Sequence, residues 1–219
     1  MFARDLGLAD TPIIAYNGAL VQEYPSGRTI SHEPVPLETC KALAAFCEAR
    51  GWYLQAYLND RLYVPELNTL SRTYAELAKV ELEPVGSLFF WLQAPSTKLL
   101  IIADPAQIPQ IQTEVRNLLG PSVEVLSSLP SYLEITSVRV SKGVALEAVA
   151  ASMGIARDEV MAIGDAMNDL SMLSWAGTGV AIGHAPEAVR RVASYITQSG
   201  PGDGVAEALV RFGLSGNPG

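Results

Sequence analysis

The sequence predicts an α/β protein in which a parallel-sheet core is split around an inserted α+β unit. In the last third, short apolar segments alternate with helical patterns, which is typical of a parallel sheet covered on both faces. In the middle third, amphipathic segments joined by short turns favour an antiparallel sheet with helices on one face. We therefore expect a core of residues 1–30 and 134–219 and an insert of residues 31–133.

Composition and charge exclude several classes of protein. The 219 residues are 49% hydrophobic and 17% charged, which suits a buried core and excludes a disordered chain. The formal charge is −8. It is −1 in residues 1–30, −4 in residues 31–133 and −3 in residues 134–219, so no segment is basic. A nucleic-acid partner, which needs a basic face, is not expected.

Membrane insertion and secretion are not expected either. The longest apolar runs, such as 88–92 and 99–103, are far shorter than the roughly 20 residues of a spanning helix. No basic stretch followed by an apolar core marks a signal peptide at the start. Cys40 and Cys47 are seven residues apart in a helical pattern, about 10 Å at 1.5 Å per residue, which is too far for a disulfide. We expect reduced thiols and a cytoplasmic protein.

Apolar periodicity and turn residues predict the elements of the first two thirds. Residues 1–8 are typical of the end of a helix that Gly7 terminates. Asn59-Asp60 and Pro25-Ser26-Gly27 indicate hairpin turns. The expected strands are 12–16, 20–24, 28–32, 52–58, 61–64, 88–92, 98–103, 123–126 and 132–136, and the expected helices are 37–50, 68–79 and 105–120.

The last third is expected to alternate helices and parallel strands. Ser141 is suited to cap a helix that ends at Gly154. The further expected helices are 168–175, one that Pro186 opens, and 203–212, and the expected strands are 160–163, 180–182 and 195–197. We expect the tail from Ser215 to Gly219 to be loose.

Acidic residues after the expected strand 160–163 are the main candidates for metal binding. Ligands bind at the carboxyl ends of parallel strands, and Asp165 follows this strand directly. Asp169 comes four residues later, in the first turn of the next helix. Paired carboxylates suit Mg²⁺, which takes few protein oxygens, several waters and a substrate phosphate. Asp and Asn are also common in turns and helix caps, so the spacing alone leaves both interpretations open.

Three other polar residues belong to the same candidate site. Lys142 opens a helix, where the helix dipole disfavours a cation, and a nearby anion would offset this. Asn17 closes the strand 13–16, where its amide could bind a phosphate or a carboxylate. Taken alone, Lys142 is better explained as a solvated lysine and Asn17 as a turn residue before Gly18. His184 is expected at the edge of the site, and it forms no metal-binding spacing with His32 or the cysteines.

A set of motifs in one order is more specific than any of these residues. The segments are Tyr16-Asn17-Gly18-Ala19, Ser141-Lys142-Gly143, Gly164 to Asp169 (GDAMND), Val180 to Ala185 (VAIGHA) and Asp203-Gly204-Val205. From residue 4 onwards the chain resembles the haloacid dehalogenase (HAD) superfamily, and within it the Cof-type phosphatases with a type IIB cap. The resemblance implies a HAD-like Rossmannoid core and identifies the insert as the α/β cap.

The resemblance also implies a mechanism and a cofactor. In this family an aspartate attacks a phosphomonoester, a second aspartate two residues later acts as acid and base, and water hydrolyses the aspartyl-phosphate. Mg²⁺ and a lysine neutralise the phosphoryl oxygens. Asp165 resembles the metal ligand, Asp169 the acidic partner on the metal or its water, and Lys142 the phosphate-binding lysine. Asn17 and Asn168 resemble polar groups that line the phosphate pocket.

Two departures from the family pattern stand out. His184 occupies the place of a usual asparagine. The nucleophile's Asp-x-Asp-Gly-Thr motif is not found, and the sequence contains no Asp-x-Asp. Two N-terminal strands that would lie between 13–16 and 160–163 are therefore expected to be missing, either through a late start or in a shortened protein. We expect the chain as given to be inactive, and the sheet gap to favour a homo-oligomer.

The resemblance implies a small phosphorylated metabolite, such as a sugar phosphate, as the substrate. The insert, residues 31–133, contains no readable code that names the compound. One alternative is a non-catalytic regulatory or binding protein that retains a phosphate pocket. Another is a fragment of a P-type ATPase, which shares the Gly-Asp-x-x-Asn-Asp turn. The lack of an apolar run long enough to span a membrane argues against the second alternative.

Overall fold

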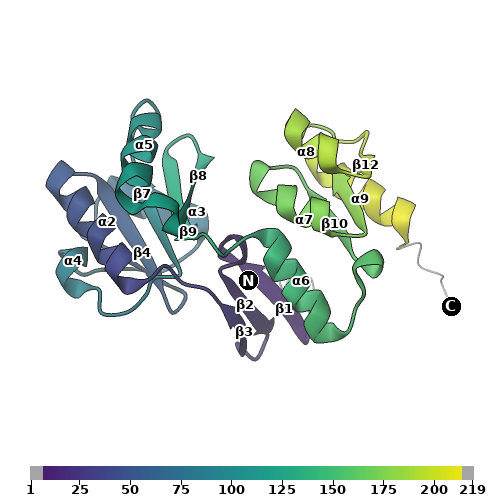
Figure 1. The fold of residues 1–219 in the computed structure, drawn as a ribbon, viewed down its shortest axis with the longest axis horizontal. Coiled ribbons are helices and arrows are strands. Elements are labelled where there is room, and N and C mark those ends of the chain that lie inside the picture. Colours follow the sequence, from purple (N-terminus) through teal and green to yellow (C-terminus); the bar gives the residue numbers. More distant parts are fainter. Residues whose placement is uncertain (1–6, 214–219) are drawn as a thin grey trace. The chain divides into compact units, whose positions relative to one another are not determined.

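The computed structural model describes residues 7–213, and these divide into two compact units (Figure 1). Unit 1 combines residues 1–30 with 141–219, and unit 2 is residues 31–140. The expected boundary at residue 134 is wrong, because it falls inside strand β9 (Tyr132–Ser137), which pairs with unit 2 strands on both sides. The predicted helix end at residues 1–6 and the predicted loose tail lie outside the described residues.

Within the described part of unit 1, the strands form two separate sheets. The first has the order β1 (Thr11–Ala15), β2 (Leu20–Tyr24), β3 (Thr29–His32), and the last two residues of β3 already belong to unit 2. The second has the order β10 (Met161–Gly164), β11 (Thr178–Ala181), β12 (Tyr195–Ile196). The second sheet is parallel, as the sequence predicts. The first strand was expected in the same parallel sheet, but β1 pairs antiparallel with β2, with Ile13 opposite Gln22. No pairing of β1 with β10 occurs among these residues.

The helices of unit 1 follow the predicted order. They are η1 (Tyr16–Gly18), α6 (Lys142–Met153), η3 (Arg157–Glu159), η4 (Met167–Asp169), α7 (Leu170–Trp175), α8 (Glu187–Val192) and α9 (Pro201–Phe212). Ser141 caps α6, since its Oγ accepts a hydrogen bond from the backbone nitrogen of Val144 at 3.1 Å. Gly154 ends the same helix with a φ of +67°. Both predicted boundaries of this helix are confirmed.

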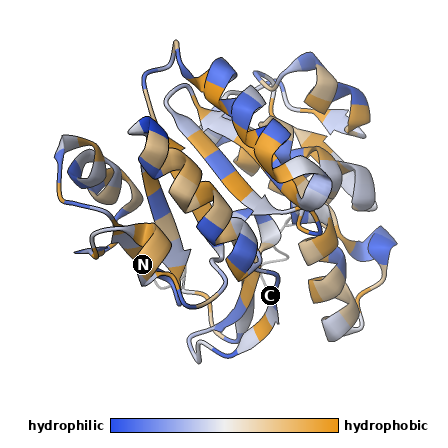
Figure 2. Ribbon diagram, turned by 60° about the vertical axis from the view of Figure 1, so that its left-hand side comes forward, coloured by the Kyte–Doolittle hydropathy of each residue, from blue (hydrophilic) through white to orange (hydrophobic). Residues whose placement is uncertain are grey.

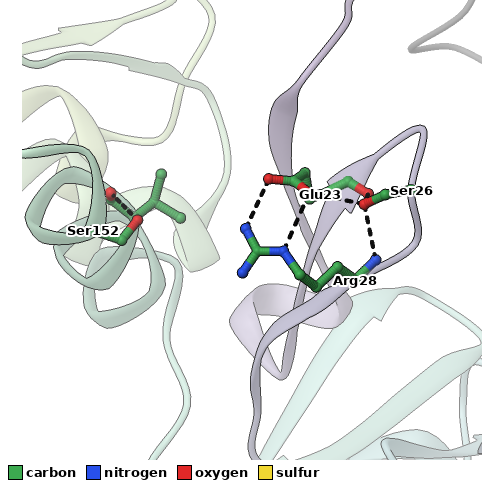
Figure 3. A network of polar contacts seen from close by, with 5 residues as sticks. Glu23, Ser26, Arg28 and Ser152 are labelled. Atoms are coloured by element: carbon green, nitrogen blue, oxygen red, sulfur yellow. Dashed lines mark hydrogen bonds and ion pairs between the residues drawn. The ribbon is translucent and has the colours of Figure 1, made fainter.

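A charged network holds the turn between β2 and β3 (Figure 3). The Glu23 carboxylate accepts hydrogen bonds from Arg28 Nη2 at 2.8 Å and from Ser26 Oγ at 2.8 Å. The Arg28 guanidinium, and then the Ser26 hydroxyl, lower the pKa of Glu23. Figure 3 also shows Ser152 of α6, whose Oγ donates to the carbonyl oxygen of Val149. The predicted hairpin therefore forms, and side-chain contacts hold its turn.

Unit 2 is built on a mixed sheet, which in the described chain has the order β6-β5-β4-β7-β9-β8. Its elements are α2 (Leu37–Arg50), β4 (Tyr53–Leu58), β5 (Arg61–Val64), α3 (Thr69–Ala78), β6 (Leu82–Pro84), α4 (Leu88–Trp91), β7 (Lys98–Ile102), α5 (Ile108–Leu119), η2 (Gly120–Ser122), β8 (Val123–Leu129) and β9. Among the described residues, neighbouring strands of this sheet pair antiparallel except β5 with β6, which pair parallel. The expected antiparallel sheet is thus confirmed, with one strand, β6, that was not predicted.

Helices cover both faces of this sheet, which corrects the expectation of one face. Leu54, Ala56 and Leu58 point from β4 into a buried core with α2 and α5. Tyr57 points to the opposite face, because side chains alternate along a strand. There its hydroxyl donates to the Tyr74 hydroxyl of α3 at 3.0 Å. The two faces therefore have different helical partners.

The predicted strand 88–92 is wrong, because residues 88–91 form helix α4. Its first turn is capped by side chains: Ser87 Oγ accepts from Phe90 N at 3.4 Å, and Glu48 Oε1 accepts from Phe89 N at 3.2 Å. A short apolar run does not by itself separate strand from helix. Helix α5 also begins three residues after the expected Pro105, since Asp104 holds residues 104–106 in a turn.

The hydropathy of the helices fits their packing against the sheets. Figure 2 shows apolar and polar bands alternating along the helices, as expected for helices with one face on a sheet. Among residues 7–213, no helix has both the length and the apolar character needed to cross a membrane.

Candidate functional site

Hydrogen bonds within the loop after β10 bring Asp165 and Asp169 together. Asp169 is 3% exposed. Its Oδ2 accepts hydrogen bonds from the backbone nitrogens of Asp165 and Ala166, both at 2.9 Å. Only glycine fits at position 164, because a Cβ there would lie 2.6 Å from the Cβ of Asp169. The loop thus turns the Asp169 carboxylate inward and leaves the Asp165 carboxylate half-exposed at the carboxyl end of β10.

Asp169 is also the ion-pair partner of Lys142. The Lys142 Nζ lies 2.5 Å from Asp169 Oδ1, and the lysine side chain is 30% exposed. Lys142 is the first residue of α6, where the helix dipole disfavours a cation. The anion expected beside this lysine is therefore, at least in part, a carboxylate of the chain itself.

The turn η1 places Asn17 beside the start of α6. Tyr16 and Asn17 have φ of +51° and +57°, and Gly18 has φ of +104°. A Cβ on Gly18 would lie 2.5 Å from the carbonyl oxygen of Ser141, so the turn packs backbone against backbone on the helix start. Asn168 Nδ2 donates to Asn17 Oδ1 at 2.9 Å. The end of β1 and the loop after β10 are thereby linked.

A cavity of about 220 Å³ opens beside these residues. Lys142 and Asn17 form its polar wall, and Ile14, Leu146 and Met172 form the rest. Nearby, the Oδ1 of Asn168 is buried and accepts no hydrogen bond within the described chain. A buried acceptor without a partner costs free energy, so a bound ligand or water that supplied a donor would stabilise this arrangement.

His184 contacts the acidic loop from the end of β11. Its Nε2 lies 2.9 Å from Asp165 Oδ2, and the two side chains are 47% and 49% exposed. Asp165 thus has a polar partner that sequence spacing did not predict, although His184 was placed at the site edge.

The donor set fits a magnesium ion held mainly by water and phosphate. Among the residues that the structure describes, no group of three or more His, Cys, Asp or Glu side chains could hold a metal. Both oxygens of Asp169 already have partners, whereas Asp165 carries an exposed carboxylate. Mg²⁺ commonly keeps several waters and binds one or two carboxylates plus a substrate phosphate. Asp165 is the residue that suits direct contact with such an ion.

All six predicted site residues lie in unit 1, and hydrogen bonds join them in two groups. One group links Asn17 with Asn168, and the other links Lys142, Asp169, Asp165 and His184. Sequence reasoning missed the apolar wall of the cavity.

Sequence reasoning also missed Ser171, whose Oγ accepts from the backbone nitrogen of Gly143 at 3.0 Å. The signal for this contact was present in the sequence. Gly143 follows Lys142 directly, and a Cβ on Gly143 would lie 2.6 Å from the carbonyl oxygen of Ser171. A glycine in the first turn of a helix indicates such a close approach of two backbones.

Several known proteins are similar to this chain in sequence and in fold. The phosphatase YwpJ of Bacillus subtilis (strain 168) is 26% identical in an alignment of 235 positions that covers 91% of this chain and 78% of that protein. A haloacid dehalogenase-like hydrolase from Bacteroides thetaiotaomicron has a crystal structure with a TM-score of 0.87 and 29% identity, covering 96% of this chain and 80% of its own. The HAD subclass IIB sugar phosphatase BT4131 has a TM-score of 0.81 and 27% identity, with coverages of 96% and 78%.

A family model for haloacid dehalogenase-like hydrolases matches residues 1–209. The match spans both units, and the solved relatives share the α/β fold. The chain therefore belongs to the haloacid dehalogenase-like hydrolase family, with Cof-type phosphatases among its relatives.

Proposed function

We propose that this chain supplies the magnesium- and phosphate-binding residues of a phosphatase that acts on small phosphorylated metabolites. The observation that carries the proposal is the meeting of three distant segments at one cavity. Asn17 and Lys142 line the cavity, and both are bonded to the loop 164–169. Cation, amide and carboxylate groups gathered at the carboxyl ends of strands are suited to a phosphate with a divalent cation.

The charges at the site support a requirement for a divalent cation. The charges of Asp165, Asp169 and Lys142 sum to one negative charge, so the bare site repels a phosphate dianion. Two unit charges 4 Å apart interact by about 4 kcal/mol at an effective dielectric constant of 20. A divalent cation reverses the sign of the site. Phosphate binding is therefore expected to depend on Mg²⁺.

Different residues of the site are assigned to the cation and to the phosphate. When bound, Mg²⁺ neutralises charge on the phosphate oxygens. Asp165 would hold the ion, and Asp169 would reach it through a water. The ion pair of Asp169 with Lys142 orients the lysine ammonium. Lys142 and the amides of Asn17 and Asn168 bind the phosphate oxygens. Sugar phosphates are the first substrate class to test, as the similarity to a sugar phosphatase supports.

A second part of the proposal concerns turnover. The family attacks the phosphomonoester with an aspartate from an Asp-x-Asp motif, and the 219 residues contain none. Covalent catalysis needs its nucleophile. We therefore propose that the 219-residue chain alone binds phosphate without hydrolysing phosphomonoesters.

Calorimetric titration with inorganic phosphate, with and without MgCl₂, tests the binding proposal. We expect phosphate to bind only with Mg²⁺ and Lys142→Met to abolish binding. Lys41→Met, on α2 of unit 2, is the matched control and should leave binding unchanged. Equal binding by Lys142→Met contradicts the assigned site. Magnesium-dependent release of phosphate from p-nitrophenyl phosphate by the purified chain contradicts the turnover proposal.

A further inference from the structure

Backbone contacts fix the loop that carries His184. The backbone nitrogen of Ile182 donates to the carbonyl oxygen of Gly164 at 3.0 Å, which extends the contact with β10 one residue beyond the end of β11. The backbone nitrogen of Gly183 donates to Thr197 Oγ1 at 3.0 Å. A Cβ on Gly183 would lie 2.6 Å from the carbonyl oxygen of Thr197. Position 184 is therefore held beside the acidic loop whatever its side chain is.

The contact between His184 and Asp165 has a defined direction. An ionised carboxylate only accepts hydrogen bonds, so the histidine Nε2 carries the hydrogen and donates it to Asp165 Oδ2 at 2.9 Å. Both side chains are about half-exposed, and exposed pairs contribute little to stability. The main consequence of this bond is therefore the orientation of the carboxylate.

The bond makes the two oxygens of Asp165 unequal. Oδ2 is bound by the imidazole, whereas Oδ1 accepts no hydrogen bond within residues 7–213. The backbone nitrogen of Asp165 is held as well, through Asp169 Oδ2 at 2.9 Å. Hydrogen bonds thus hold the backbone nitrogen and Oδ2 of Asp165, and its Oδ1 remains able to bind a cation. Hydrogen bonds of this kind to metal-binding carboxylates typically change metal affinity 10- to 100-fold.

We propose that His184 is a positioning residue that orients the Asp165 carboxylate for a divalent cation and thereby raises the affinity for that cation. The inference rests on the proposed function in one respect, namely that Asp165 holds the ion. It adds a residue that acts through Asp165, with no contact of its own to the cation or the phosphate.

Titration calorimetry with MgCl₂ alone tests the proposal without any turnover. His184→Ala removes the donor and should weaken magnesium binding about 10-fold or more. His184→Gln restores an N–H of similar reach and should recover most of the affinity. His32→Gln is the matched control, because His32 also has a side-chain partner, Thr97 Oγ1 at 3.0 Å, but lies in unit 2. Circular dichroism melting checks that each variant is folded.

The outcomes separate this inference from the proposed function. If the wild type binds Mg²⁺ and His184→Ala binds it equally well, the positioning role is wrong and the magnesium site stands. If the wild type binds no Mg²⁺, the proposed function fails and the positioning role fails with it. A third outcome is that His184→Gln binds Mg²⁺ as weakly as His184→Ala and binds Ni²⁺, which favours imidazole, less tightly than the wild type. His184 would then itself be a metal ligand, and the positioning role is overturned.

Discussion

Replacing Asp169 by alanine is expected to destabilise unit 1 and to open the loop after β10. The alanine removes three interactions at once. Two are the hydrogen bonds that Oδ2 accepts from the backbone nitrogens of Asp165 and Ala166, and the third is the ion pair of Oδ1 with Lys142. Asparagine at the same position keeps an acceptor for the two amides and loses only the ion pair.

The size of the loss in unfolding free energy depends on how exposed the partners of Asp169 are. A hydrogen bond to a charged group contributes about 1.5–3 kcal/mol, but Asp165 and Ala166 are exposed, so water replaces part of each bond. Lys142 is 30% exposed, which discounts the ion pair to about 1 kcal/mol or less. We expect Asp169→Ala to lower the free energy of unfolding by about 3 kcal/mol and Asp169→Asn by about 1 kcal/mol.

Urea unfolding followed by circular dichroism measures the change in stability. Hydrogen–deuterium exchange of a peptide covering residues 161–170 reports the loop directly, because it contains both amides that Asp169 binds. Exchange should be faster in Asp169→Ala than in Asp169→Asn. Asp158→Asn, at an exposed position in η3, is the control and should stay within about 0.5 kcal/mol of the wild type.

A double-mutant cycle isolates the ion pair. In a Lys142→Met background, Asp169→Asn should cost less than in the wild type, by roughly 0.5–1 kcal/mol. The reasoning is refuted if Asp169→Ala changes neither the unfolding free energy nor the exchange of this peptide. It is also refuted if alanine and asparagine have the same effect, since the backbone bonds would then contribute nothing.

Three further predictions test other parts of the fold. Gly18→Ala should lower the melting temperature more than Gly27→Ala. Gly18 has φ +104°, and a Cβ there would lie 2.5 Å from a backbone oxygen, whereas Gly27 has φ +70° and its Cβ would lie in open space. Equal melting temperatures of the two variants would contradict the close packing at Gly18. A tyrosine hydroxyl and backbone amides lower the pKa of Glu207 from 4.5 to about 2. The ionised carboxylate therefore stabilises the fold above pH 4.5, and this contribution is lost as the pH falls towards 2. In Glu207→Gln, the melting temperature should fall less steeply between pH 4.5 and pH 2 than in the wild type. Burial raises the pKa of Cys40 to about 11 and of Cys47 to about 12, so both thiols should resist a disulfide reagent at pH 8 until the protein unfolds.

Local signals in the sequence predicted most elements correctly. The turn Asn59-Asp60 joins β4 and β5, and Ser141 and Gly154 bound α6, because turn and cap preferences act over a few residues. The errors involve partners that are distant in the chain. Residues 88–91 are apolar enough for a strand, but Glu48, some forty positions away, caps them as a helix. Likewise, the pattern of residues 11–15 does not reveal that β1 pairs with β2 and not with the parallel strands.

For the candidate site, the sequence predicted which residues lie near one another better than it predicted which contacts they make. The spacing of Asp165 and Asp169 places them in one loop, and the structure brings them together there. Spacing does not say which way a carboxylate turns, and Asp169 turns toward Lys142 and two backbone amides. The apolar residues Leu146 and Met172 were recognisable only as helix faces, because a cavity wall depends on how two helices pack.

A crystal structure of the chain soaked with Mn²⁺ and phosphate tests the central claim most directly. Mn²⁺ replaces Mg²⁺ on oxygen ligands and is located by its anomalous scattering. The account predicts a manganese peak at the Asp165 carboxylate and phosphate density beside Lys142 Nζ and Asn17. Manganese bound at other acidic residues, with no phosphate in the cavity beside Lys142, would contradict it.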